Sequence, residues 1–384
     1  MSDTGNTAKS CDIFCSVVDN YGDIGVCWRL ARQLSKEHGM AIRLWVDDLR
    51  SFGKLCPELD VTLEVQVCHG VEIHHWGSVF ATIEPVDMVI GAFACEIPKP
   101  YVEAMALRQP QSVWLNLEYL SAEDWVEGCH KLPSPHPTLP LIKYFFFPGL
   151  TEKTGGLLLE HDLLQQRDAF QSDAEVQGRY WRGLGVLERV AGELRVSLFG
   201  YENGAMEDLL RAWEQGGQAV TCLLPEGRSV SQVAVFFGRS AGKAGDIWQR
   251  GNLRVHVLPF VEQERYDELL WACDINFVRG EDSCVRAQWA ARPFIWQIYP
   301  QHDGVHLQKL EALRVHYASS LPPAVAQAVR DLWLAWNGGA DIAGAWQRFV
   351  AQREVLDAHG RDWAQHLSGN NLALNLLDFF SQTE

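Results

Sequence analysis

The chain has 384 residues, more than a single hydrophobic core usually serves, so its length favours two domains. Its formal net charge of −16 repels phosphate backbones and anionic lipids, which disfavours nucleic acid and membranes as partners. No apolar run approaches the length of a membrane span, and the polar residues 1–10 lack the features of a secretory signal. We therefore expect a cytoplasmic protein.

The first half of the chain alternates strand-like and helical patterns. Residues 12–18 are apolar and β-rich, and a loop at 19–25 leads into helical periodicity over residues 26–38 that stops at Gly39. Further strand-like runs follow at residues 41–46, 61–67, 86–93 and 112–117. This alternation predicts a mainly parallel sheet wrapped by helices.

The second half repeats the rhythm after an interruption. Residues 120–159 are rich in proline and aromatic residues, and we expect them to form loops. The last helical pattern, at residues 363–380, has no strand after it and is expected to pack as a closing helix. Between these segments, strand-like runs occur at residues 194–199, 219–224, 253–258, 274–278 and 294–298, and a helix-like segment at 205–215.

We therefore expect two α/β domains. The N-terminal domain is predicted to span residues 1–185 and to be completed by the closing helix at about 361–384, and the C-terminal domain to span residues 186–360. The boundary lies near residue 185 because glycine and arginine interrupt the pattern between residues 177 and 190. No short repeat or heptad run is present, which excludes solenoids and coiled coils.

Ten cysteines are scattered along the chain without a CxxC pair. Several lie in apolar strand-like runs, where a thiol packs as a small hydrophobic group, so reduced core cysteines are the favoured interpretation. Cys129 and His130 with His136 lack the spacing of a zinc site. We expect no metal and no other cofactor.

The loop after the first strand carries two carboxylates where a dinucleotide-binding protein has glycines for phosphate. It reads DNYGDIG from Asp19 to Gly25 and lacks the GxGxxG pattern. A loop at the carboxyl end of a strand faces the ligand crevice of an open α/β sheet, so a cationic or hydroxylic acceptor suits this position better than a pyrophosphate. The alternative is that Asp19 or Asp23 caps the following helix, which leaves the other carboxylate unexplained.

A second constellation follows the strand-like run at residues 274–278. Arg279 and Gly280 lead into a helix start at which Ser283 offers a hydroxyl group. Free N–H groups and the dipole at a helix N-terminus bind phosphate, and Arg279 can add a charge-assisted contact. The alternative is a helix capped by Asp282 or Ser283 that carries surface arginines.

Aromatic side chains occupy loop-like positions in the second half. Phe199 and Tyr201 follow its first strand, and Phe260, Gln263 and Tyr266 follow a later one. Together these residues offer a stacking face and a polar edge contact for a pyrimidine base. Taken alone, such aromatics are also typical of core or lid packing.

In this order, these stretches resemble the protein-arginine rhamnosyltransferases of translation elongation factor P. The resemblance spans nearly the whole chain, and it is carried by the loop at residues 19–25, by residues 277–289, and by the runs DIFC at 12–15, WRLARQL at 28–34, WLNLEYL at 114–120, FPG at 147–149 and LFGYE at 198–202. It implies the α/β GT-B architecture, with two Rossmann-like domains facing across a central cleft. It further implies that the acceptor, elongation factor P, binds the N-terminal domain and that TDP-β-L-rhamnose binds the C-terminal domain.

The resemblance also implies an inverting transfer that forms an α-linked rhamnosyl-arginine without a metal and activates the factor. It assigns the general base to Asp19, a second required carboxylate to Asp23 and a further active-centre carboxylate to Glu281. Tyr266 stands where some relatives have phenylalanine, which keeps the stacking face. The donor-binding residues implied are Phe199, Tyr201, Gln263, Tyr266, Arg279, Asp282 and Ser283, and the expected donor site also takes in Asn20, Tyr21, Gly22 and Gly280.

Other functions remain open at this point. One alternative is an enzyme with the same GT-B fold that uses another nucleotide-sugar or modifies a small acceptor. Another is a non-catalytic protein that binds a nucleotide and a translation factor but transfers no sugar. An NAD-dependent oxidoreductase is disfavoured because the glycine fingerprint is missing. The residue patterns alone indicate a two-domain enzyme with an anion site in its second half. Rhamnose and elongation factor P come from the resemblance.

Overall fold

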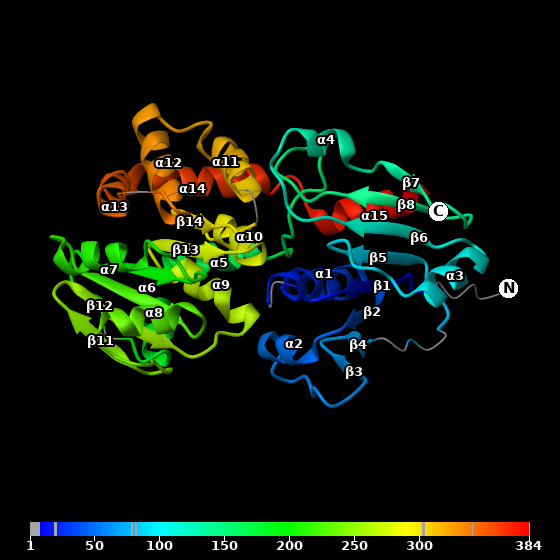
Figure 1. Ribbon diagram of the computed structural model, residues 1–384, viewed down its shortest axis with the longest axis horizontal. Coiled ribbons are helices and arrows are strands. Elements are labelled where there is room, and N and C mark those ends of the chain that lie inside the picture. Colours follow the sequence, from blue (N-terminus) through cyan, green and yellow to red (C-terminus); the bar gives the residue numbers. More distant parts are fainter. Residues whose placement is uncertain are drawn as a thin grey trace. The chain divides into compact units, whose positions relative to one another are not determined.

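The computed structural model describes residues 8–18, 21–77, 80, 83–186, 188–301, 304–339 and 341–383. Its contacts divide the chain into two compact units: Met1–His161 with Leu367–Glu384, and Asp162–His366. Each unit is built around one mainly parallel sheet (Figure 1). Among the described residues, no helix combines the length and the apolar character that crossing a membrane requires.

The sheet of the first unit has the strand order β3-β4-β2-β1-β5-β6-β8-β7. Its edge strands β3 and β7 run antiparallel to their neighbours, and the strands between them are parallel. The order reverses between β1 and β5, as in a doubly wound Rossmann fold, and this switch point is where such sheets bind ligands. The elements are β1 (Ser10–Cys15), α1 (Gly22–His38), β2 (Ala41–Val46), α2 (Leu49–Leu55), β3 (Val65–Cys68), β4 (Val71–His75), β5 (Met88–Ala92), α3 (Lys99–Leu107), β6 (Val113–Leu117), α4 (Trp125–Cys129), β7 (Pro133–Pro135), β8 (Ile142–Phe146) and α15 (Leu372–Thr383).

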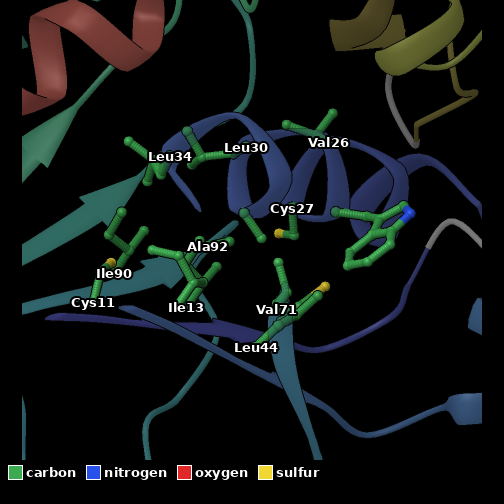
Figure 2. Close-up of a cluster of buried hydrophobic side chains, with 14 of the residues drawn as sticks. Cys11, Ile13, Val26, Cys27, Leu30, Leu34, Leu44, Val71, Ile90 and Ala92 are labelled. Carbon is green, nitrogen blue, oxygen red and sulfur yellow. The ribbon is translucent and has the colours of Figure 1, made fainter. Parts of the chain in front are cut away.

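Helix α1 covers one face of this sheet. Cys27, Leu30 and Leu34 recur at helical spacing on its buried side and join Ile13 of β1 in one apolar cluster (Figure 2). The helix ends where the sequence predicts, because Gly39 has a left-handed φ of 65° and donates its N–H to the carbonyl of Ser35. The packing of α1 on β1 fixes the position of the loop that joins them.

The C-terminal helix α15 belongs to the first unit, but residues 361–366, which we expected to join it there, belong to the second unit. Leu372, Ala373, Leu376 and Phe380 of α15 lie in the same apolar cluster as α1. The single helical pattern over residues 363–380 is nevertheless two helices, since α14 ends at Leu367 and α15 begins at Leu372. The break occurs because the side chain of Asn371 accepts the backbone N–H of Ala373 and so starts a new helix.

The prediction that residues 120–159 form only loops is wrong. The aromatic run in this segment forms β8, which pairs in parallel with β6 so that Tyr144 lies opposite Leu115. Tyr144 and Phe146 point to the buried side with a period of two, which is the pattern of a strand rather than a loop. The prolines of β7 are tolerated because that strand lies at the sheet edge.

The second unit has a six-stranded sheet with the order β11-β12-β10-β9-β13-β14. Strand β11 is antiparallel to β12, and the others are parallel. The order again reverses, here between β9 and β13. The elements are α5 (Leu163–Ser172), α6 (Ala174–Gly183), β9 (Leu194–Leu198), α7 (Met206–Gln215), β10 (Val220–Pro225), α8 (Ser229–Phe236), β11 (Ile247–Arg250), β12 (Leu253–Leu258), α9 (Gln263–Ala272), β13 (Ile275–Arg279), α10 (Asp282–Trp289), β14 (Phe294–Gln297), α11 (Val305–Ala318), α12 (Pro323–Trp336), α13 (Ile342–Val350) and α14 (Arg353–Leu367).

The units meet along the chain between His161 and Asp162, earlier than the boundary expected near residue 185. Helix α5 belongs to the second unit because its polar side chains satisfy carbonyl groups at the ends of other helices. Arg167 donates to the carbonyl of Trp289 over 2.9 Å, and Gln171 donates to that of Ala290 over 3.0 Å. These partners lie more than a hundred residues away in the sequence, so no local pattern indicates them.

Candidate active site

The loop after β1 is held by two carboxylates from neighbouring elements. The N–H of Val17 and the hydroxyl of Ser16 donate to Asp47 at the end of β2, over 2.9 and 2.5 Å. The N–H of Val18 donates to Asp23 over 2.8 Å. Asp19 and Asn20, which follow in the sequence, lie outside the described residues.

Asp23 is the second residue of α1, and its side chain is only 2% exposed. The N-cap of α1 is Tyr21, which makes no side-chain cap bond, and Gly22 is the first helical residue. The alternative in which Asp23 is the capping residue is therefore wrong, because its carboxylate bonds the N–H of Val18 instead. In the first turn it still interacts favourably with the positive end of the helix dipole.

The loop after β5 lies on the other side of the same switch point. Phe93 and Ala94 have left-handed φ angles of 56° and 58°, which are uncommon for residues with a Cβ atom. The ring of Phe93 stacks on that of Tyr119 with centroids 4.5 Å apart. Cys95 follows, and burial, helped by nearby Cys15 and Asp47, raises the pKa of its thiol to about 12. The thiol also interacts with the backbone of Ser16, which links this loop to the loop after β1.

A groove of about 620 Å³ begins at the loop after β5, a size typical of ligand pockets. Its lining includes three carboxylates, from Glu96, Glu103 and Glu118. Aromatic residues form part of its wall, and the ammonium group of Lys143 lies 5.5 Å from the centroid of the Trp114 ring. The lining also includes Lys99, so the carboxylates outnumber the ammonium groups by one and leave a slight negative charge at this edge of the first unit.

In the second unit, the ends of β9 and β13 bring an arginine onto two aromatic rings. The strands are parallel neighbours, so the residues after them leave the sheet at the same edge. The guanidinium of Arg279 lies 4.7 Å from the centroid of Phe199 and 4.4 Å from that of Tyr201. Phe199 in turn meets the ring of Tyr266 edge-on at 5.8 Å. The expected stacking residues therefore form one cluster.

The guanidinium of Arg279 has an open donor. The residue is 7% exposed, yet its Nη1 has no hydrogen-bond partner among the described residues. A buried donor without a partner costs free energy unless a ligand satisfies it. A phosphate oxygen is the ligand that best matches this charged N–H group.

The turn between β13 and α10 presents this arginine at a helix start. Gly280 has a left-handed φ of 63°, and its carbonyl accepts the indole N–H of Trp296 over 2.6 Å. The hydroxyl of Ser283 accepts the N–H of Arg279 over 3.1 Å and also donates to the carbonyl of the same residue. The described contacts of Ser283 therefore position Arg279, while the N–H groups of the first turn of α10 supply the anion-binding character.

Helices α9 and α10 are joined by polar contacts at their starts. Gln263 donates to Asp282 over 3.2 Å, and Arg286 forms a buried two-bond pair with Asp267 over 2.8 and 2.7 Å. Burial, with the Asp282 carboxylate as the next cause, raises the pKa of the Tyr266 phenol, so this group stays neutral. Glu281 is the N-cap residue of α10 and lies beside these residues in the chain.

The predicted site residues thus fall into two sets. The described residues Tyr21, Gly22 and Asp23 belong to the start of α1 in the first unit. The other predicted residues that the structure describes lie in the second unit, around the ends of β9 and β13: Phe199, Tyr201, Gln263, Tyr266, Arg279, Gly280, Glu281, Asp282 and Ser283. Phe260 lies in the segment just before α9 and is half-buried.

Some residues of these two edges were missed by the sequence reasoning. Asp47 closes β2 and could have been found by the same strand-end rule that singled out Asp19. Nothing in the sequence around Phe93 indicates its left-handed φ angle, because tertiary contacts impose that backbone conformation. Gln297 accepts the N–H of Tyr201 over 2.9 Å from within β14, and nothing in its local sequence indicates this contact.

The cysteines and histidines considered for a metal site have other roles. All ten cysteines are free thiols. His130 accepts the N–H of Phe147 over 3.1 Å, and His136 accepts the N–H of Leu139 over 3.1 Å, so each imidazole bonds the backbone through Nδ1. Burial, followed by the charge of Lys131, lowers the pKa of His130 to about 4.

Known proteins match the chain over almost its full length. The family model described as Elongation-Factor P (EF-P) rhamnosyltransferase EarP matches residues 11–381. A protein-arginine rhamnosyltransferase of Pseudomonas putida is 51% identical over 370 residues, which cover 96% of this chain and 98% of that protein. The enzyme of the same name from Pseudomonas aeruginosa is 48% identical over 373 residues, covering 97% and 99%.

Solved structures agree with this match. One, described as the structural basis for EarP-mediated arginine glycosylation of translation elongation factor EF-P, is 38% identical with a TM-score of 0.70 and covers 98% of this chain and 99% of its own. A glycosyltransferase of Rickettsia africae is 9% identical with a TM-score of 0.52, covers 98% of each chain and shares the fold alone. The two Rossmann-like domains are those of a GT-B glycosyltransferase. The chain therefore belongs to the EarP family of protein-arginine rhamnosyltransferases.

Proposed function

We propose that the protein transfers L-rhamnose from TDP-β-L-rhamnose to an arginine side chain of translation elongation factor P, with inversion at the anomeric carbon. The names of its relatives and the similar solved structure support arginine of this factor as the acceptor. The observation that carries the donor side is Arg279, a buried arginine stacked on two rings with an open N–H at the start of a helix.

In this proposal the second unit binds the donor. The rings of Phe199, Tyr201 and Tyr266 provide a stacking face for the thymine base, while Arg279 and the first turn of α10 bind the diphosphate. Negative charge develops on TDP as it leaves, and the same cationic and N–H groups stabilise it in the transition state. The step therefore needs no metal ion.

The first unit binds the acceptor arginine. A guanidinium remains protonated far above pH 7 and spreads its lone pairs over a planar cation, so its nitrogens are poor nucleophiles. Carboxylates help in two ways: one removes a proton as the nitrogen attacks, and another orients the guanidinium through paired N–H contacts. We assign the base to Asp19 and the orienting role to Asp23 or Glu281. The buried Asp23 and the carboxylates of the groove give this unit the charge that a cationic acceptor requires.

The atoms balance in a single displacement. An acceptor nitrogen forms a bond to the anomeric carbon while the bond from that carbon to the TDP oxygen breaks, and TDP leaves with the electron pair. Asp19 takes the proton that the nitrogen loses. Attack opposite the leaving group converts the β-linked donor into an α-linked product.

The test is the intact mass of elongation factor P after incubation with the protein and TDP-β-L-rhamnose. We expect the mass of one added deoxyhexose, which peptide fragmentation locates on an arginine. Asp19→Asn keeps the side-chain shape and removes the base, so it should lose the transfer, whereas Asp48→Asn, at the cap of α2, should retain it. Transfer by Asp19→Asn at a near wild-type rate would disprove the role of that residue.

Two other results would reject the proposal itself. Binding of the factor without any mass change would support the non-catalytic alternative. Calorimetric preference for a UDP- or GDP-sugar over TDP-rhamnose would support a different transferase.

A further inference from the structure

A cluster of metal-ligand atoms lies at the end of α2, outside the candidate active site. Cys56 is the C-cap residue of α2, and Glu58 follows it two positions later. His69 begins the turn that joins β3 to β4. The Sγ atom of Cys56, a carboxylate oxygen of Glu58 and a ring nitrogen of His69 all lie within 4.8 Å of one another.

The spacing of these atoms matches a tetrahedral zinc site. Zinc bonds of about 2.0–2.3 Å at tetrahedral angles place neighbouring ligand atoms roughly 3.3–3.8 Å apart. The distance from the Sγ of Cys56 to Oε2 of Glu58 is 3.6 Å. The distance from that oxygen to Nε2 of His69 is 3.8 Å. The remaining distance, from the Sγ of Cys56 to the His69 ring, is at most 4.8 Å, so side-chain movements of up to about 1 Å bring these atoms into a coordination sphere.

The thiol of Cys68 can serve as a fourth ligand, but it lies outside the group of atoms within 4.8 Å and donates to Oε1 of Gln66 over 3.9 Å, so its side chain has to turn toward the cluster. This residue ends β3, is 8% exposed and interacts directly with the thiol of Cys56 and the charge of Glu58. Two thiols, an imidazole and a carboxylate are soft and borderline donors, a set that selects zinc over magnesium or calcium.

We propose that Cys56, Glu58, Cys68 and His69 bind one divalent zinc ion that ties the end of α2 to the β3–β4 hairpin. On binding, each thiol forms a sulfur–zinc bond and releases its proton to solvent. The ion closes a loop of the chain between Cys56 and Cys68. The strand at the end of this loop, β3, lies at the edge of the sheet and pairs only with β4. Its role is structural, and the proposed transfer takes no step through it.

The surroundings of His69 keep its ring in place. The turn is a two-residue hairpin loop of His69 and Gly70, both with left-handed φ angles, of 50° and 80°. The ring of His69 meets that of Trp28 nearly at right angles with centroids 5.8 Å apart. The imidazole is thus oriented by α1, while Cys56 is placed by α2.

The experiment uses the full chain, reduced and stripped with a chelator. After incubation with zinc chloride and gel filtration, elemental mass spectrometry should find about one zinc ion per chain. Cobalt in place of zinc should give the near-ultraviolet charge-transfer band of a thiolate–cobalt bond. Because this readout needs no donor or acceptor, its failure is distinguishable from failure of the proposed function.

Variants at the exposed ligands separate binding from folding. The side chains of His69 and Glu58 are 41% and 64% exposed, so His69→Asn and Glu58→Gln should fold and should weaken zinc affinity by about tenfold or more. Asparagine also tolerates the left-handed φ of the turn. Cys56→Ser removes one of the two thiolates and should clearly weaken the cobalt band, whereas Cys129→Ser, at a half-buried thiol on α4, should leave it intact.

Several results would overturn the proposal. These are a reduced wild-type chain that retains no zinc, unchanged affinity in both His69→Asn and Glu58→Gln, or loss of zinc in Cys129→Ser. Zinc-free reduced protein together with a Cys56–Cys68 disulfide in protein purified without reductant would instead make the two thiols a redox pair.

Discussion

The guanidinium of Arg279 lies 4.4 Å from the centroid of the Tyr201 ring, and no carboxylate is paired with it among the described ion pairs. Aromatic rings, and not a carboxylate, therefore hold this buried guanidinium in place. A paired aspartate would have neutralised its positive charge. Since its Nη1 has no hydrogen-bond partner in the described part of the chain, the cation is poised for an anionic ligand.

Arg279→Gln should weaken TDP binding by about 10- to 100-fold, because a hydrogen bond to a charged group contributes about 1.5–3 kcal/mol. Isothermal titration calorimetry measures this change. The matched control is Arg250→Gln, since Arg250 also lies over two rings, 4.8 Å from Phe236 and 5.5 Å from Phe237, outside the site. Equal TDP affinity in wild type and Arg279→Gln would contradict the assigned role.

Asp23→Asn should lower the rate of rhamnosyl transfer by about 100-fold or more, in the range of general acid–base and positioning effects. The asparagine oxygen can still accept the N–H of Val18, so the melting temperature should change little. Asp48→Asn is the control, because Asp48 also accepts backbone N–H groups, those of Arg50 and Ser51. A rate loss that merely follows a loss of folded protein would refute a chemical role for Asp23.

Asp267→Ala should destabilise the second unit by about 3–5 kcal/mol, because it leaves the buried Arg286 without its two-bond partner. Donor binding should weaken as well, since this pair joins α9 to α10. Urea unfolding measures the free-energy change. The control is Glu207→Ala in the exposed ion pair Arg211–Glu207, which should lower the free energy of unfolding by only about 0.2–1 kcal/mol. Similar losses of unfolding free energy in Asp267→Ala and Glu207→Ala would show that burial does not strengthen the Arg286–Asp267 pair.

Acid should destabilise the protein partly through His130. Burial lowers the pKa of its imidazole to about 4, while a histidine in the unfolded chain titrates near 6.5. The unfolded chain binds the proton first, so this contribution to stability is present above pH 6.5 and is lost as the pH falls toward 4. His256 and His359, whose pKa values burial also lowers, act in the same direction.

His130→Gln should therefore flatten the fall in melting temperature between about pH 6.5 and 4. The physical cause is the burial of the imidazole, followed by the charge of Lys131, and the N–H of Phe147, which donates to Nδ1, also loses its acceptor when the ring is protonated. The control His366→Gln removes an exposed imidazole from α14 and should leave the slope unchanged. An identical pH slope in His130→Gln and wild type would rule out this histidine as a contributor.

Much of the architecture could be predicted from compact apolar runs. Residues 41–46 and 253–258 are strands with those bounds, and apolar residues predominate in each run. Strand β4 was not predicted, since Glu72 and two histidines interrupt its pattern and pairing with β2 and β3 supplies its stability. Similarly, the strand expected at residues 61–67 is displaced to β3, which begins at Val65.

In the site, residues next to strand ends could be predicted, whereas residues that act through contacts with distant segments could not. Tyr201 and Arg279 could be found because they lie at or just beyond the carboxyl ends of strands of a parallel sheet. Gln297 and Asp267 could not, because their contacts join segments 96 and 19 residues apart. The cluster of Cys56 and His69 was missed for a related reason: a hairpin, and not a short motif, brings the two residues together.

The contribution of α15 to the first apolar cluster has a consequence for synthesis on the ribosome. Leu372, Leu376 and Phe380 are translated after the whole of the second unit, yet they belong to the core that β1 and α1 begin. The second unit is continuous from Asp162 to His366 and can complete its core before those residues emerge. The domain that is translated first therefore needs residues translated after the second domain to complete its core.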